Sequence, residues 1–79
     1  MGKECLHAFR KSENEEIRIS AGKYRDKHYF DIRLFFKPSE NQEEDMRPTR
    51  KGVTLPIDFL SEIEKGITLT KKYRQSIEV

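Results

Sequence analysis

The stretch HYFDIRLFF, from His28 to Phe36, is the most strand-like part of the sequence. It is rich in aromatic and β-branched residues and contains neither glycine nor proline, which is typical of a strand. Because successive side chains of a strand point to opposite faces, the stretch predicts a core face and a face that mixes rings with charge. The core face carries Phe30, Ile32, Leu34 and Phe36. The mixed face carries Tyr29, Asp31, Arg33 and Phe35.

Further strands are predicted on both sides of this stretch. Before it, apolar and polar residues alternate from Ile17 to Gly22, and Arg25-Asp26-Lys27 forms a tight polar connection. Cys5–Arg10 is a less distinct edge strand, separated from Ile17 by a polar turn over Ser12–Glu16.

After the central stretch, Lys37–Met46 contains proline, serine, asparagine and four acids, which predicts a loop. Arg47–Leu55 is extended again. Pro48 and Gly52 within it indicate an edge strand or a bulge.

One helix is expected after the strands. Pro56 suits a first helical turn, and apolar residues then recur at helical spacing through Phe59, Leu60 and Ile63. Gly66 is typical of a helix end, so the helix is expected over Pro56–Lys65. The last segment, Ile67–Val79, is either a final strand or a mobile basic tail.

The element order predicts an α+β fold in which the helix covers the apolar face of an antiparallel sheet. The 79 residues are expected to form one domain, with a core at about residues 5–66 and residues 67–79 as the tail or extra strand. Only 34% of the residues are apolar and 38% are charged. A domain this small buries a modest core, so the composition favours a dimer that shares its core.

The net charge of +2 is unevenly distributed along the chain. Four acids fall within Glu40–Asp45, and the rest of the chain holds 16 Lys and Arg against 10 Asp and Glu. A positive surface that meets polyanions is one interpretation, and a solvated surface of mixed charge is the other.

Several classes of function find no support in the sequence. The one cysteine, Cys5, forms no intrachain disulfide, which fits a reducing intracellular compartment, and its spacing from His7 matches no zinc pattern. No phosphate-binding glycine loop and no nucleophile–base pair is recognisable. We therefore expect no catalytic residue, no cofactor, no metal and no membrane span, and predict a protein that is not an enzyme.

The sheet surface is the remaining candidate site, because single-stranded nucleic acid needs cations along its phosphates and rings against its bases. Basic residues lie in or beside the predicted central strands, a second basic cluster precedes the helix, and rings are interleaved with both. These candidates are Arg18, Lys23, Arg25, Lys27, Arg33, Arg47, Arg50 and Lys51, with Tyr24, Tyr29, Phe35 and Phe36.

Three segments in this order resemble the positive-cofactor-four family of transcriptional coactivators. The segments are Lys23-Tyr24-Arg25-Asp26-Lys27, Phe30-Asp31-Ile32-Arg33 and Arg50-Lys51-Gly52-Val53-Thr54-Leu55. The resemblance spans about Glu15–Gly66. It implies a strongly curved four-stranded antiparallel sheet with one helix, a homodimer formed through the helices, and binding of single-stranded or unwound DNA.

By the same resemblance, Tyr24 is the turn aromatic, with Arg25 and Lys27 as its basic neighbours. Arg33 matches the family's strand arginine. Phe36 stands where the family usually has a tryptophan that stacks on a base, although strand alternation places Phe36 on the core face. Arg47, Arg50 and Lys51 match the cationic cluster before the helix.

The leading hypothesis is therefore a sequence-tolerant single-stranded-DNA-binding homodimer that acts in transcription or another DNA transaction. The alternatives are a protein-interaction module without DNA contact, with transcription-machinery proteins as partners, and an RNA-binding protein. A prokaryotic or phage source is favoured because the family's eukaryotic N-terminal extension is missing. The expected location is the cytoplasm or nucleoid, or the nucleus in a eukaryote.

Overall fold

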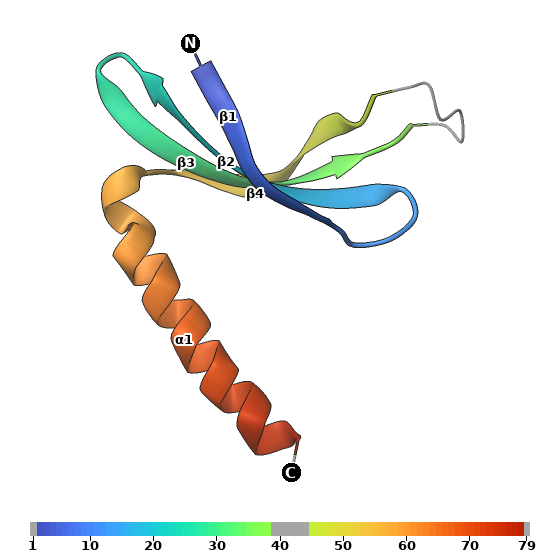
Figure 1. Cartoon of the computed structure of the whole chain (residues 1–79), viewed down its shortest axis with the longest axis vertical. Helices are drawn as coiled ribbons and strands as arrows, with labels where there is room; N and C mark the ends of the chain where they lie inside the picture. The colour runs from blue at the N-terminus through green and yellow to red at the C-terminus, as the bar shows by residue number, and fades with distance from the viewer. Residues whose placement is uncertain (1, 39–44, 79) are drawn as a thin grey trace.

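The computed structural model describes residues 2–38 and 45–78, which form an open four-stranded sheet followed by one long helix (Figure 1). The strands are β1 (Gly2–Arg10), β2 (Glu15–Tyr24), β3 (Lys27–Phe36) and β4 (Arg47–Pro56). Each pairs antiparallel with its neighbour in the sequence, so that β1 and β4 are the two edges. The expected α+β fold is confirmed, including the edge position of both weaker strands.

The β2–β3 hairpin closes through a two-residue turn. Tyr24 pairs with Lys27, and the two residues between them, Arg25 and Asp26, have positive φ angles of 51° and 68°. Two consecutive positive φ angles are the geometry of a type I′ turn, whose twist matches that of the strands it joins. The turn therefore fixes the β2–β3 register, in which Ile17, Ile19 and Ala21 lie opposite Leu34, Ile32 and Phe30.

The apolar core lies on β3. Phe30 and Leu34 are the buried apolar residues of the described chain, with 3% and 6% of their surfaces exposed. Both belong to the predicted core face, whereas Phe36 at the end of the same face is 38% exposed. We call the side of the sheet that carries Ile17, Ile19, Phe30, Ile32 and Leu34 the apolar face.

The edge strand β4 contains a bulge. Its register with β3 shifts between Arg33, which pairs with Gly52, and Phe35, which pairs with Pro48. Thr49, Arg50 and Lys51 thus lie opposite the single residue Leu34. Gly52 follows the bulge where the strands are so close that a Cβ atom would lie 2.6 Å from the carbonyl oxygen of Ile32. The prediction of an edge strand or a bulge at Pro48 and Gly52 is correct on both counts.

The helical segment is longer than its predicted bounds. After β4, a 3₁₀ turn, η1 (Ile57–Phe59), leads into α1 (Leu60–Ile77). The predictions of a helix end at Lys65 and of a strand or mobile tail after Gly66 are wrong. Gly66 lies inside the helix with a negative φ. Its cost to the helix of about 1 kcal/mol is smaller than the helix-forming preference of the residues around it.

The helix projects away from the sheet (Figure 1). Its main contacts are with η1, and none of its residues is buried. The expectation that it covers the apolar face is therefore wrong for this single chain. The reason is that η1 follows β4 at once, so no loop lets the helix fold back. The radius of gyration is 15.2 Å, against about 12 Å for a compact domain of this length.

Substitution of the two glycines by alanine should have opposite effects on stability. Gly52→Ala places a methyl group against the backbone of β3 and should lower the free energy of unfolding by about 1–3 kcal/mol. Gly66→Ala meets no atom within 4 Å and should raise it by up to about 1 kcal/mol. Urea unfolding followed by circular dichroism measures both, and equal effects would contradict the close approach at Gly52.

Candidate nucleic-acid interface

The second side of the sheet, which we call the polar face, carries Arg18, Ser20, Asp31, Arg33 and Phe35. The register places Arg18 directly opposite Arg33, and Ser20 directly opposite Asp31. Ser20 and Asp31 are buried, with 6% and 3% of their surfaces exposed. Buried polar groups need partners, and every buried side-chain nitrogen or oxygen in the described residues has one.

Arg18 and Phe35 form one unit on this face. The Arg18 guanidinium lies 4.3 Å from the centre of the Phe35 ring, a cation–π contact. Its Nε donates a hydrogen bond of 2.6 Å to Oε2 of Glu16, and Arg10 approaches the same carboxylate at 3.8 Å. Arg18 is thus held by an acid and a ring, and one side of the Phe35 ring is covered.

The β2–β3 hairpin presents the most accessible candidates. Tyr24 is 48% exposed, and the Arg25 guanidinium lies 5.3 Å from the centre of its ring. Lys23 and Lys27 flank the turn and are exposed, and neither forms an ion pair with a described residue. An exposed ring in contact with one guanidinium, with two further lysines on the same hairpin, can meet a base and its phosphates.

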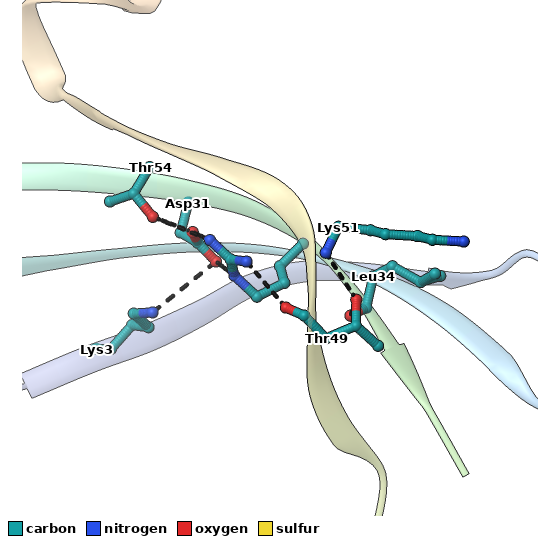
Figure 2. A network of polar contacts seen from close by, with 7 residues as sticks. Lys3, Asp31, Leu34, Thr49, Lys51 and Thr54 are labelled. Carbon is teal, nitrogen blue, oxygen red and sulfur yellow. Dashed lines mark hydrogen bonds and ion pairs between the residues drawn. The ribbon is translucent and has the colours of Figure 1, made fainter. Parts of the chain in front are cut away.

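Asp31 and Arg33 form a second unit on the polar face; Figure 2 labels Asp31 there, with Lys3 and Thr54 near it. Nη2 and Nε of Arg33 donate hydrogen bonds of 2.8 and 3.2 Å to the two carboxylate oxygens of Asp31. The Thr54 hydroxyl donates to the same carboxylate, and Nζ of Lys3 lies 3.8 Å from it. The Asp31 side chain is only 4% exposed and that of Arg33 only 20%.

The titration of Asp31 reflects these contacts. Burial by itself would raise the pKa of Asp31. The hydrogen bonds from Arg33 and Thr54 and the positive charges of Lys3 and Arg33 outweigh burial, so that its pKa lies below the ordinary value of 3.8. The same hydrogen bond to Asp31 raises the pKa of Arg33, which burial alone would lower.

The β4 bulge carries Arg50 and Lys51, both exposed. The Thr49 hydroxyl donates a hydrogen bond of 2.8 Å to the Leu34 carbonyl and accepts one of 3.0 Å from the Lys51 amide. Arg33 Nη1 donates one of 2.9 Å to the Thr49 carbonyl. In Figure 2 the Lys51 side chain extends away from this network.

The structure therefore brings only part of the predicted site together. Residues with polar-face register positions are Arg18, Tyr24, Lys27, Tyr29, Arg33 and Phe35. Lys23 and the paired residues Phe36 and Arg47 fall on the opposite side by alternation, whereas Arg25 lies in the turn and Arg50 and Lys51 lie in the bulge. The acids Glu40, Glu43 and Glu44 of the predicted acidic loop lie outside the described residues.

Sequence reasoning missed Lys3, Thr49 and Thr54. Lys3 and Thr54 carry no distinguishing pattern in the sequence, and Thr49 gains its role only from the bulge. The burial of Asp31 had a usable signal, since Asp31 and Arg33 share a face two residues apart.

A hollow of about 410 Å³ lies beside the hairpin. Tyr24 and Tyr29 line it together with Gly22, Phe30 and Lys3. In the part of the chain that the structure describes, no three His, Cys, Asp or Glu side chains gather to hold a metal ion. No helix there is both long and apolar enough to cross a membrane.

The sequence pattern of the family described as Transcriptional Coactivator p15 (PC4) matches residues 11–64. The chain belongs to this family. The matched range contains β2, β3, β4 and every predicted interface residue, so the three segments that suggested the family lie within the match. The family is one of transcriptional coactivator homologues.

Solved structures of PC4 relatives have the same fold. BPSL1147, a PC4 homolog from Burkholderia pseudomallei K96243, is 28% identical to this chain at a TM-score of 0.76 in both of its crystal forms. The alignment covers 89% of this chain, and 90% or 98% of the relative in the orthorhombic or tetragonal form. No curated protein sequence matches the chain significantly.

A PC4 homolog from bacteriophage T5, implicated in recombination-dependent DNA replication, is 19% identical at a TM-score of 0.56. The alignment covers 95% of this chain and 78% of that one. At this identity the likeness concerns the fold alone.

The Asp31 network predicts a specific acid dependence of stability for this PC4 family member. Because the folded pKa lies below the unfolded value of 3.8, the network contributes stability above that value and loses it as the pH falls further. Asp31→Asn should therefore flatten the loss of unfolding free energy as the pH falls below about 4. Urea unfolding at several pH values measures it. Asp26→Asn, an exposed turn residue, is the control and should keep the wild-type slope; an equally steep slope in Asp31→Asn would contradict the network.

Proposed function

We propose that the chain is a non-catalytic protein that binds single-stranded DNA with little sequence preference. It acts as a homodimer in transcription or another DNA transaction. The observation that carries this proposal is the set of exposed cations and rings at the β2–β3 hairpin and the β4 bulge. Membership of a coactivator family supports the role in transcription, with transcription-machinery proteins as a further partner class.

The chemistry of the hairpin and the bulge suits a single strand better than a duplex. A duplex hides the faces of its bases, whereas a single strand offers them for stacking, at about 1–3 kcal/mol per base. Tyr24 at the hairpin is exposed, and so is Phe36, whose register partner is Arg47. Each ring is therefore next to a cation that can take a phosphate.

Sequence tolerance follows from the same groups. Every base has a ring face, and every nucleotide has a phosphate, so stacking and charge do not distinguish one sequence from another. Bidentate recognition of base edges needs a guanidinium or amide held with free donors. The three arginines with polar-face register positions are already engaged by carboxylates: Arg10 and Arg18 by Glu16, and Arg33 by Asp31.

The dimer is supported by the total surface that one chain leaves exposed and by the apolar side chains on its helical segment. The accessible surface is 6851 Å², against about 5,000 Å² for a compact monomer of 9.4 kDa. Phe59, Leu60 and Ile67 on the helical segment are each about half exposed. Leu60, Ile63 and Ile67 share one side of α1 at helical spacing, so a second copy of the helix is the natural cover for them.

The central prediction concerns affinity and salt. A labelled oligo-dT should bind at low salt, and binding should weaken steeply with added salt because cations on the protein release counterions from the strand. Arg50→Ala/Lys51→Ala should weaken binding and make the log–log salt slope shallower by about 1.4, which corresponds to two phosphates. Fluorescence anisotropy measures both quantities.

Lys71→Ala/Lys72→Ala on α1 removes the same charge far from the bulge and should change affinity less. Wild-type protein that fails to bind oligo-dT at low salt would end the proposal. Binding that survives both Tyr24→Ala and Phe36→Ala unchanged would instead favour a module that meets acidic partners through charge alone.

The dimer has its own prediction. Ile67 is 52% exposed in one chain, and Ile67→Glu would bury a carboxylate in the proposed helix pair, so it should shift the protein towards monomers. Sedimentation velocity measures the change. Thr68→Glu adds the same charge on the polar side of α1, beside Glu64 and Lys72, and should remain dimeric. A wild-type protein that sediments as a monomer would contradict the proposal.

A further inference from the structure

Arg33 has little capacity left for a phosphate. Four of its five N–H groups already donate hydrogen bonds within the sheet: two to Asp31, one to Thr54 and one to the Thr49 carbonyl. Its charge is neutralised by a carboxylate at 2.8 Å. A phosphate that recruited Arg33 would leave the buried carboxylate without its main partner, which is costly.

The contacts of Arg33 instead lead to the β4 bulge. Its bond to the Thr49 carbonyl spans from β3 to β4 at the position where the regular register is lost. Next to it, the Thr49 hydroxyl joins the Leu34 carbonyl to the Lys51 amide. Backbone groups that the shifted ladder would leave without regular partners are thus held by Arg33 and by Thr49.

The bulge ends at Gly52, where the backbone of β4 lies close to the backbone of β3. A Cβ atom at Gly52 would lie 2.9 Å from Cα of Arg33, so β4 lies directly against Arg33 where the bulge ends. Arg33 is thus in contact with the bulge at its start, through Thr49, and at its end, through Gly52. The conformation of Arg50 and Lys51 is set between these two points.

We propose that Asp31 and Arg33 are positioning residues that bind no phosphate. They hold the β4 bulge so that Arg50 and Lys51 face the bound DNA strand. This inference rests on the proposed single-stranded-DNA binding and changes the role expected for Arg33. Asp31 orients the guanidinium, Lys3 and Thr54 orient Asp31, and Arg33 orients the backbone of the bulge. Arg50 and Lys51 are the phosphate contacts.

The test is whether one substitution, Asp31→Asn, raises or lowers the affinity for oligo-dT. Asp31→Asn removes a negative charge beside the interface, so a directly binding Arg33 would be freed and affinity for oligo-dT would rise. If Arg33 is a positioning residue, the same change releases the bulge and affinity falls by about 2- to 30-fold, the range seen for residues that act without touching the ligand. Asp26→Asn is the matched control: it removes the same negative charge at the exposed turn and should not weaken binding.

A double-mutant cycle locates the effect. In an Arg50→Ala/Lys51→Ala background, Asp31→Asn should cause no further loss, because the groups that it misplaces are already gone. A full loss in that background would overturn the inference, since it would mean that Asp31 and Arg33 act independently of the bulge.

Thr49→Val serves where Asp31→Asn does not fold. It removes both hydrogen bonds of the Thr49 hydroxyl without changing charge or shape, and it should weaken oligo-dT binding while the Lys51 amide exchanges faster by NMR. An unchanged affinity and exchange rate would overturn the inference. Failure of the proposed function would look different from failure of this inference, because wild-type protein would then not bind oligo-dT. The amide exchange rate of Lys51 would still report whether the bulge depends on Asp31 and Thr49.

Discussion

The ion pair between Asp31 and Arg33 is the interaction on which the polar face depends. It joins the centre of β3 to the edge strand β4 through the Thr49 carbonyl, and to the other edge strand, β1, through Lys3. An open sheet has no helix over this face, so polar side chains must satisfy one another there. A buried pair of this kind contributes little net free energy compared with apolar packing, but removing one member is expensive. Its value to the fold is thus specificity: it fixes how β4 lies against β3.

The apolar side of the molecule follows a different constraint. Two buried apolar residues, Phe30 and Leu34, make a very small core, and α1 does not enlarge it because the helix leaves the sheet directly after Pro56. The exposed surfaces of the sheet and of the helix consequently differ in chemistry. Under the proposed function, the sheet offers cations and rings to the DNA strand, whereas the helix offers apolar side chains to a second copy of the chain. In the proposed dimer, folding and assembly are coupled, since part of the apolar burial that stabilises the protein occurs only when the second copy is present.

The parts of this structure that the sequence predicted are those governed by local pattern. Alternation in HYFDIRLFF located the buried Phe30 and Leu34, and Gly52 signalled the bulge. The errors came from longer-range causes. Gly66 is a common helix end, but whether a glycine ends a helix depends on the residues beyond it, and here they continue the helical period. The position of the helix depends on a link too short to reverse the chain. The sequence did not predict that the N–H groups of Arg33 are already hydrogen-bonded. Two of their acceptors, on Thr49 and Thr54, are distant in the sequence and lie beside Arg33 only because of the register of β4.

Charge pairing also decides which basic residues shape the electrostatic surface. Arg18 and Arg33 lie at the centre of the polar face, but each is matched by a carboxylate within 3 Å, so their fields largely cancel. Among the Lys and Arg residues of the sheet, those without an ion pair to a described residue lie at the β2–β3 turn, at the start of β4 and in the β4 bulge. A flexible polyanion is attracted where positive charge is uncompensated, not where arginines are most numerous. Under the proposed function, the charge-paired centre of the polar face therefore supports the interface, and the β2–β3 turn and the β4 bulge meet the ligand.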